Sequence, residues 1–499
     1  MEAALPQRSR YPARGVPRRG EDERTTETDR ARRGARKTPK LRIERDALGE
    51  IAVPADALWG AATQRALASF SASGERFPRE FLRALGLVKA AAAAANAQAG
   101  ALDATRAEAI GAASRELALG QLDDQMVLDV FQTGSGTSTH MNANEVIASR
   151  ARALLGPGAP AVHPNDHVNR SQSSNDVMPT ALHVAARLEI HERLLPALRE
   201  LRAALLAKAD ELDAVVKPGR THLMDATPVR LSQELLGWAR QVELGIERVA
   251  AAAEELAELA LGGTAVGTGI NCPPGFAADA IARLSAATGL SFREAADHFE
   301  AQGARDAAVQ ASAALRTVAI SLAKIANDLR LLASGPRCGL GELELPALQP
   351  GSSIMPGKTN PVLCEVVVQV AGQVIGNDAA VAFGGISGQL ELNACLPLIA
   401  RNLLASIRLL AGAAESFARL CVRGLAAHPE RCADLAERSL SLATALVPAL
   451  GYDLVAEIAK DALATGRSLR EICLARSVLD ASELDRLLDP LRQTDPEAS

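Results

Sequence analysis

The sequence predicts an all-α fold built around long, buried helices. Aromatic residues make up only 3% of the 499 residues, so Ala, Leu, Val and Ile must supply most of the apolar volume of a chain that is 48% hydrophobic. Such a core suits closely packed helices, because Ala and Leu favour helices and let their backbones approach. The length exceeds what one small core needs and indicates roughly three domains.

The two ends of the chain differ from its middle. Residues 1–40 mix Arg, Glu, Asp, Thr and Pro with almost no apolar periodicity, which predicts a disordered N-terminal tail. In residues 41–171, helical stretches at 80–98 and 106–117 alternate with Gly- and Asn-rich segments, so we expect a mixed but mainly helical domain. Residues 431–499 are more polar and predict a small C-terminal helical domain.

The central domain, residues 172–430, is expected to be a bundle of long helices. Apolar residues recur there at spacings of three and four, with Ala between them, which is helical periodicity. The stretches are 180–215, 230–261, 303–332 and 362–382. Pro196 should kink or interrupt the first of them. Helices that are apolar on more than one face must be buried between several neighbours, so we expect a bundle shared between subunits.

Charge and cysteine usage exclude several classes of protein. The net charge of -5 gives no general attraction to nucleic acid or to an anionic membrane. No window approaches the ~18 uninterrupted apolar residues that a membrane helix needs. The seven cysteines are odd in number and none pairs at CxxC spacing, so we expect reduced thiols in a cytoplasmic protein, with no metal site.

The segment 351–361, GSSIMPGKTNP, is the strongest candidate for chemistry. Gly and Pro at both ends favour a strained loop between two helical stretches. Within it, Ser352 could act as a base, Lys358 supplies a cation and Asn360 supplies an amide. A polar connection between helices is the alternative. The ending GKT resembles a nucleotide-binding P-loop, but five residues separate the two glycines instead of four and no strand precedes them, which excludes that site.

Two further segments suit the binding of an anion. Residues 134–142, GSGTSTHMN, offer backbone N–H groups freed by glycine and several hydroxyls, which suit a carboxylate. Residues 171–176, SQSSND, come directly before a long helix whose N-terminus would attract an anion. Ser, Asn and Asp are equally normal helix N-caps, so the second segment also has a purely structural interpretation.

A fourth segment, 219–228, contains His222, which can titrate near neutral pH. A lone His beside a helix start is more often structural, but Glu365, just past the 351–361 loop, could orient it. The four segments contain neutral donors, a Lys, a His and a candidate base, without a metal cluster or a dinucleotide fingerprint. Such a set suits the stabilisation of a doubly charged carboxylate intermediate without a cofactor.

The segment 351–361 resembles the signature of the fumarase/aspartase superfamily, and the resemblance runs in the same order from about residue 41 to about residue 490. Other matching segments are 162–168, 172–179, 219–228, 261–269, 334–341 and 388–393. The sequences SSND at 173–176, PGK at 356–358 and ELN at 391–393 are similar to class II fumarases, whereas 361–362 and 374–378 have some aspartase character. The resemblance implies a three-domain fumarase/aspartase-like fold whose long central helical bundle is shared in a homotetramer.

The resemblance also implies a reaction, the reversible hydration of fumarate to (S)-malate in the tricarboxylic acid cycle, with aspartate ammonia-lyase as the alternative. Ser352 would remove a proton to give an aci-carboxylate, Lys358 would stabilise the developing charge, and His222 paired with Glu365 would assist proton transfer at the leaving hydroxyl. The active site would be built from three subunits. The substrate-binding residues would be Ser135, Gly136, Thr137, Ser173, Ser174, Asn175, Thr221, Ser353, Thr359 and Asn360.

Two other features follow from the same resemblance. His163, Pro164, Asn165 and Asp166 match a secondary carboxylate site, although a helix-capping loop without a ligand is an equal alternative. The sequence departs from the family pattern at His140, where Asn is usual, and at Thr359, where Val is usual. His140 could carry charge and shift the substrate preference or the pH optimum.

Overall fold

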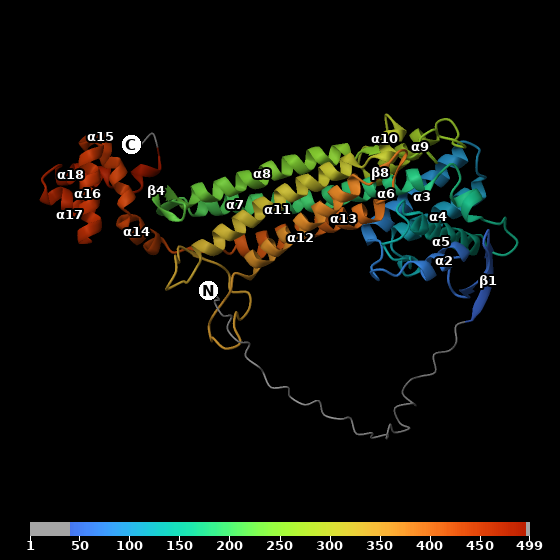
Figure 1. The fold of residues 1–499 in the computed structure, drawn as a ribbon, viewed down its shortest axis with the longest axis horizontal. Helices are drawn as coiled ribbons and strands as arrows, with labels where there is room; N and C mark the ends of the chain where they lie inside the picture. Colours follow the sequence, from blue (N-terminus) through green and yellow to red (C-terminus); the bar gives the residue numbers. More distant parts are fainter. Residues whose placement is uncertain (1–39, 496–499) are drawn as a thin grey trace, which may run out of the picture.

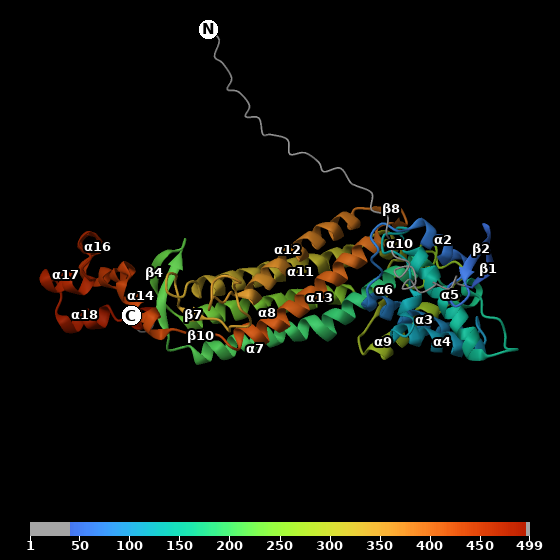
Figure 2. The same cartoon turned by 90° about the horizontal axis from the view of Figure 1, so that it is seen from below.

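The computed structural model describes residues 40–495 and has the form of a long rod (Figure 1). An N-terminal helical region lies at one end, a bundle of long helices forms the middle, and a group of short helices lies at the other end (Figures 1 and 2). The predicted tail at residues 1–40 falls outside the described residues except for Lys40. The three-domain division stays a prediction.

The N-terminal region begins with a strand pair and continues as helices. Strands β1 (Leu41–Asp46) and β2 (Gly49–Pro54) form an antiparallel hairpin. The helices that follow are α2 (Ala61–Ser69), α3 (Arg79–Gln98), α4 (Ala104–Ala118) and α5 (Thr137–Leu155). Helices α3 and α4 lie within two residues of the stretches predicted at 80–98 and 106–117, so both predictions are confirmed.

The bundle contains helices from five separate parts of the chain. They are α6 (Ser174–Glu189) with its continuation α7 (Leu195–Glu211), α8 (Leu231–Glu255), α11 (Asp306–Leu332), α12 (Val362–Gly385) and α13 (Leu396–Phe417). In cross-section, α7, α8, α11, α12 and α13 follow one another around a ring, and α13 packs against α7 to close it. The four long helical stretches predicted from the sequence are present, whereas α13 lay outside the predicted set.

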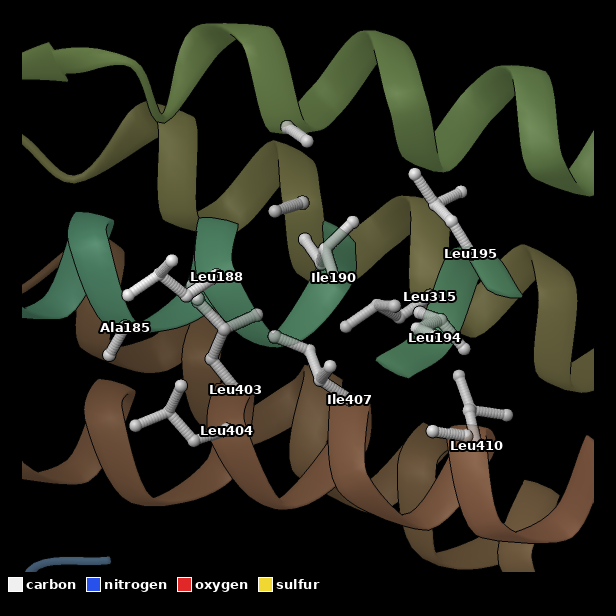
Figure 3. Close-up of a cluster of buried hydrophobic side chains, with 14 of the residues drawn as sticks. Ala185, Leu188, Ile190, Leu194, Leu195, Leu315, Leu403, Leu404, Ile407 and Leu410 are labelled. Atoms are coloured by element: carbon white, nitrogen blue, oxygen red, sulfur yellow. The ribbon is translucent and has the colours of Figure 1, made fainter. Parts of the chain in front are cut away.

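Each bundle helix buries a stripe of apolar side chains spaced three or four residues apart. In α11 the stripe is Ala308, Ala311, Leu315, Val318, Leu322, Ile325, Leu329 and Leu332. Figure 3 shows the centre of the core, where Leu188, Ile190 and Leu194 lie between Leu315 of α11 and the Leu403 to Leu410 face of α13. Burial of one such side chain contributes about 1.5–3 kcal/mol, so this shared core holds the helices in register.

Pro196 interrupts the first long helix, as predicted. A π-helical turn, Ile190–Leu194, separates α6 from α7, and Pro196 is the second residue of α7. Proline has no backbone N–H and its ring clashes with the carbonyl four residues earlier. The wider π turn absorbs that clash and lets α7 continue along the bundle.

Three bundle helices are more apolar than their burial in one chain requires. The segments Asp306–Leu332, Val362–Gly385 and Leu396–Val422 are long and apolar enough to cross a membrane by length and composition. The sequence expectation, which counted uninterrupted apolar residues, did not identify these three segments, because charged residues such as Glu365 and Asp378 of α12 interrupt an apolar run that is still strongly apolar on average. On α12, Val366, Ile375 and Phe383 are exposed, and Phe383 is 60% exposed.

The C-terminal region has a small core of its own. Helices α14 (Pro429–Arg438), α15 (Val447–Leu450), α16 (Tyr452–Thr465), α17 (Leu469–Ala475) and α18 (Ala481–Leu487) make up most of it. Its buried apolar residues, from Leu442 to Leu488, form a cluster separate from the core that runs from Phe77 to Cys432. Residues 431–495, the part of this segment that the structure describes, are mainly helical as predicted, and the C-terminal domain boundary stays a prediction.

Short elements connect the long helices. Strands β3 (Val216–Thr221) and β4 (Met224–Arg230) form a hairpin. The two-residue strand pairs are β5 (Glu258–Leu259) with β6 (Arg293–Glu294), β7 (Leu343–Glu344) with β10 (Ala426–Ala427), and β8 (Gly388–Gln389) with β9 (Leu392–Asn393). Helices α9 (Phe276–Thr288) and α10 (His298–Gly303) cover the end of the bundle beside α6.

His183 on α6 should make stability depend on pH. Its Nδ1 lies 2.8 Å from the Glu258 carbonyl oxygen, and burial lowers the pKa of His183 from 6.5 to about 4. Between these values the unfolded chain binds a proton that the folded chain does not, so stability falls as the pH drops from 6.5 towards 4. We expect the free energy of unfolding to fall about 2 kcal/mol further in the wild type than in His183→Asn between pH 7 and pH 4.5.

Chemical denaturation at fixed protein concentration measures this difference. The Asn amide can still donate to the Glu258 carbonyl but does not titrate, so the carboxylates contribute equally to both proteins. Equal pH slopes for the two proteins would contradict a neutral, buried His183.

Candidate active site

The candidate site residues fall into two clusters at opposite ends of the bundle. The helix-start cluster lies where α5 and α6 begin and contains Ser135, Gly136, Thr137, Ser173, Ser174 and Asn175. The loop cluster contains Thr221, His222, Ser352, Ser353, Lys358, Thr359, Asn360 and Glu365. The loop cluster lies at the start of α12, whose first turn carries Glu365, whereas Gly134 accepts a hydrogen bond from Leu396 N just beyond the other end of α12. The 24 residues of α12 therefore separate the clusters by about 36 Å within one chain.

Glycines shape the loop that leads into α5. Gly136 has a φ of 74°, a left-handed conformation that favours glycine, and a Cβ there would lie 2.6 Å from Met178 Cε on α6. A Cβ at Gly134 would lie 1.8 Å from the Ala394 carbonyl oxygen. The Ser135 and Thr137 hydroxyls are 2.7 Å apart. The close packing holds the two hydroxyls and the α5 N-terminus beside α6.

The start of α6 is fixed by a capping box. Ser173 Oγ accepts from Asn175 N at 3.2 Å, and Asp176 Oδ1 accepts from Ser173 N at 2.9 Å. The other Asp176 oxygen accepts from Gly262 N and Thr264 N, at 3.1 and 3.0 Å. The N-termini of α5 and α6 therefore lie together, and two helix dipoles favour an anion at the same place.

Three buried polar groups lie behind the helix-start cluster. Lys89 Nζ donates to Asn169 Oδ1 and Gln172 Oε1, and burial lowers its pKa well below the usual range. Burial raises the pKa of Asp176 to about 6, although backbone N–H groups favour its charged form. Burial, aided by Lys89, lowers the pKa of His140 well below its usual range. The expectation that His140 could carry charge is therefore wrong, because no water reaches its imidazole.

Hairpin β3–β4 carries His222 at its tip. The sequence suggested a helix start at His222, but Thr221 pairs with Met224 and the two residues between them form the turn. His222 and Leu223 have φ values of 56° and 62°, which are uncommon for residues other than glycine. Leu223 is 73% exposed and Met224 70%. An exposed apolar tip with a strained backbone indicates a contact surface for another protein segment.

A buried ion network fixes the base of this hairpin. Arg220 donates to both oxygens of Glu342, at 2.8 and 3.0 Å. Lys217 Nζ lies 3.0 Å from Glu234 and 3.4 Å from Glu342, and Glu342 is completely buried. Because Glu342 lies just before the 351–361 loop, the network ties the hairpin that carries His222 to the segment that leads to Ser352.

The 351–361 loop closes on itself through its own polar groups. Gly351 N donates to the Lys358 carbonyl at 2.7 Å, and Asn360 Nδ2 donates to the Gly351 carbonyl at 3.1 Å. Ser352 Oγ accepts two backbone hydrogen bonds, from Ile354 N at 3.2 Å and from Met355 N at 3.0 Å. Two N–H groups directed at one hydroxyl oxygen stabilise negative charge on it.

The same loop opens to solvent on its outer side. Ser352, Lys358 and Thr359 line a surface hollow of about 500 Å³. Lys358 Nζ donates to Asn360 Oδ1 at 2.6 Å, so Lys358 and Asn360 are held as a pair. Within residues 40–495, no group of three or more His, Cys, Asp or Glu side chains could hold a metal ion.

Some predicted partners are not brought together within one chain. Among the described residues, no hydrogen bond or ion pair joins His222 to Glu365. At the predicted secondary site, His163 Nδ1 accepts from Asn165 N and Asp166 N, at 3.3 and 3.2 Å, and caps the π-helical segment Pro164–Val168. The structure thus gives this segment a capping role, and its ligand role stays a prediction.

The sequence reasoning did not single out Lys89 or Glu342. Lys89 is the one charged residue in the apolar run 84–95, and such an isolated charge indicates a buried polar group. Glu342 carried no comparable local signal, because its partner Arg220 is 122 residues away in the sequence.

Comparison with known proteins shows the family to which this chain belongs. Residues 49–376 match the family described as Lyase, and residues 442–494 match the family described as Fumarase C C-terminus. The chain is 54% identical to a class II fumarate hydratase of Corynebacterium efficiens, over 91% of this chain and 96% of the relative. It is 56% identical to that of Halobacterium salinarum, over 90% and 96%.

A solved structure has the same fold. The class II fumarase from Schistosoma mansoni superposes with a TM-score of 0.89 at 39% identity, covering 92% of this chain and 100% of that one. The all-α fold and the resemblance expected from the sequence are confirmed, and the chain belongs to the class II fumarate hydratase family.

Proposed function

We propose that this chain catalyses the reversible hydration of fumarate to (S)-malate, with Ser352 as the base that removes the proton next to a carboxylate. The observation that carries this proposal is the pair of backbone N–H groups donated to Ser352 Oγ. A free serine hydroxyl is far too weak a base, and these two donors stabilise its alkoxide. Family membership supports the same reaction.

The two clusters divide the work of binding and chemistry. Removal of the proton from malate gives an aci-carboxylate, with two negative charges on one side of the intermediate. Lys358, Asn360, Ser353 and Thr359 supply a cation and neutral donors near that charge. The helix-start cluster holds the other carboxylate through its hydroxyls and the two helix N-termini.

His222 is proposed to assist the departure of the malate hydroxyl, with Glu365 orienting it and Thr221 holding the substrate. In one chain His222 is exposed and without a hydrogen bond to Glu365, so this pairing needs the assembled protein. No cofactor enters the scheme. Proton transfer by such groups typically contributes about 10² to 10⁴-fold to the rate.

We infer that the assembled enzyme is a homotetramer whose active sites draw residues from three chains. The two clusters lie about 36 Å apart, the length of α12, so one chain cannot form a complete site. The exposed apolar residues support burial by other copies, since Ile354 on the loop is 83% exposed and Ile386 after α12 is 81% exposed. Contacts between copies of this chain also explain the strongly apolar helices better than a membrane does. Helix α12 buries Asn377 and Asp378, and such polar residues are costly within a membrane.

Mixing two inactive variants tests the shared site. Ser352→Ala removes the base in the loop cluster, and Ser174→Asp places a negative charge in the helix-start cluster. If the clusters of one site come from different chains, random mixing leaves about a quarter of the sites with both segments intact. We expect the mixture, reassembled after reversible dissociation, to recover about a quarter of the wild-type activity.

Each variant mixed with itself serves as the control and should stay inactive. Recovery of no activity by a reassembled mixture of the two would mean that both clusters act within one chain.

Ammonia release from aspartate is the second candidate reaction, because residues 361–362 and 374–378 have some aspartase character. Formation of fumarate from malate and from aspartate, measured in parallel by the ultraviolet absorbance of the fumarate double bond, separates the two. We expect turnover of malate alone. Turnover of aspartate alone would overturn the proposed function.

Two further assignments remain proposals. We place the enzyme in the cytoplasm, which agrees with the free state of all seven cysteines. The segment His163, Pro164, Asn165 and Asp166 is proposed as a secondary carboxylate site, with His163 Nε2 as its free donor, since Nδ1 accepts the backbone N–H groups.

A further inference from the structure

His140 lies directly behind a residue of the helix-start cluster. It is on α5, its side chain is completely buried, and its Nδ1 lies 2.7 Å from Ser174 Oγ. The other ring nitrogen, Nε2, is buried and has no hydrogen-bond partner among the described residues. The imidazole therefore makes one polar contact, and that contact is with Ser174.

The unpaired Nε2 indicates which nitrogen carries the proton. Burial, aided by Lys89, lowers the pKa of His140 well below its usual range, so the ring is neutral and has one N–H. A proton on Nε2 would be a buried donor without an acceptor, and orphaned buried N–H groups are rarer than unpaired acceptors. A proton on Nδ1 can be donated to Ser174 Oγ, and only the lone pair of Nε2 is then left unpaired.

The position of the proton decides what Ser174 can do. If Nδ1 accepts, the hydroxyl proton of Ser174 is directed at His140, and only the lone pairs of Oγ face outward. If Nδ1–H donates, Oγ uses a lone pair inward and its proton is free to point outward. Ser174 is the first residue of α6 and is partly exposed, so a free O–H there adds to the helix N-terminus as a donor for an anion.

We propose that His140 is a positioning residue that donates its Nδ1–H to Ser174 Oγ and so turns the Ser174 hydroxyl into a donor for a substrate carboxylate. His140 does not touch the substrate and acts only through Ser174. The inference rests on the proposed function, in which the helix-start cluster holds one carboxylate of fumarate or malate.

Three substitutions at position 140 separate this role from simple packing. His140→Asn places an amide N–H where Nδ1 lies and keeps the hydrogen bond. His140→Leu fills the space without a donor, and His140→Gln carries its amide one bond further, towards Nε2. We expect Leu and Gln to raise the KM for malate and fumarate about tenfold with a smaller change in kcat, and Asn to restore KM to within about twofold of the wild type.

The same substitutions in a Ser174→Ala background complete the test. Without the Ser174 hydroxyl, His140 has nothing to position, so His140→Leu should not raise KM further. Leu and Gln serve as alternatives if one of them does not assemble, which size-exclusion chromatography and melting temperature establish.

Three outcomes would overturn the proposal. The first is an unchanged KM in His140→Leu or His140→Gln. The second is a rise in KM on His140→Leu that is as large in the Ser174→Ala background as in the wild-type background. The third is a KM in His140→Asn as high as that in His140→Leu. A wild-type enzyme inactive on both malate and fumarate would instead contradict the proposed function, so the two failures are distinguishable.

Discussion

Ser352→Ala is expected to lower kcat for fumarate hydration by about 10³-fold or more, within the range for loss of a positioned proton-transfer group. The substitution removes the Oγ that accepts from Ile354 N and Met355 N. These N–H groups lie in a loop open to solvent, so water replaces the lost acceptor and the fold does not suffer. Melting temperature and oligomeric state should therefore match the wild type, while steady-state kinetics show the loss.

A matched control is Ser69→Ala on α2. The Ser69 hydroxyl is exposed and belongs to neither cluster. It donates a hydrogen bond to the Arg65 carbonyl of its own helix at 3.0 Å. We expect full activity from this variant. Comparable activity in Ser352→Ala would refute the assignment of Ser352 as the base.

Glu342→Gln is expected to destabilise the folded protein by about 3–5 kcal/mol, the usual effect of removing one partner from a buried ion network. The amide has one acceptor where the carboxylate had two, and its N–H groups face the Arg220 guanidinium and the Lys217 ammonium. Arg220, whose side chain is 13% exposed, loses its carboxylate partner, and Lys217, 1% exposed, keeps only its ion pair with Glu234. Chemical denaturation at fixed protein concentration measures the loss.

The same variant should also be less active at temperatures where it stays folded, because the network holds the hairpin that carries His222. Glu344→Gln is the matched control two residues away. Its carboxylate is exposed and lies 3.9 Å from His428, so we expect a change within about 0.5 kcal/mol. Equal stability of the two variants would mean that Glu342 does not carry the network.

The long helices could be predicted because their signal is local. The stripe in α11 repeats at three and four residues over its whole length, and a packed bundle needs nothing more. The same spacing of Leu396, Ile399, Leu403, Ile407 and Leu410 marks α13, so this helix was within reach of the sequence as well. Pro196 gave a correct local prediction, since the effect of proline on a helix does not depend on distant residues.

The geometry of the candidate site could not be predicted in the same way. The hairpin at His222 lacks the Asn-Gly or Asp-Gly turn that marks a two-residue hairpin, and its backbone is instead fixed by ion pairs to a residue 122 positions away. The neutral state of His140 follows from burial by helices that are distant in the sequence. The sequence identified Ser352, but its two N–H donors became visible only from the loop conformation.

The length of helix α12 sets the distance between the two clusters. One residue inserted into it would turn everything beyond by about 100° and add about 1.5 Å of length, so the two ends could no longer both meet their neighbours. Length variation among natural relatives should consequently accumulate in the surface connections and at the chain ends. The long helices, though far from any reacting atom, are then under as strict a constraint on length as the site is on chemistry.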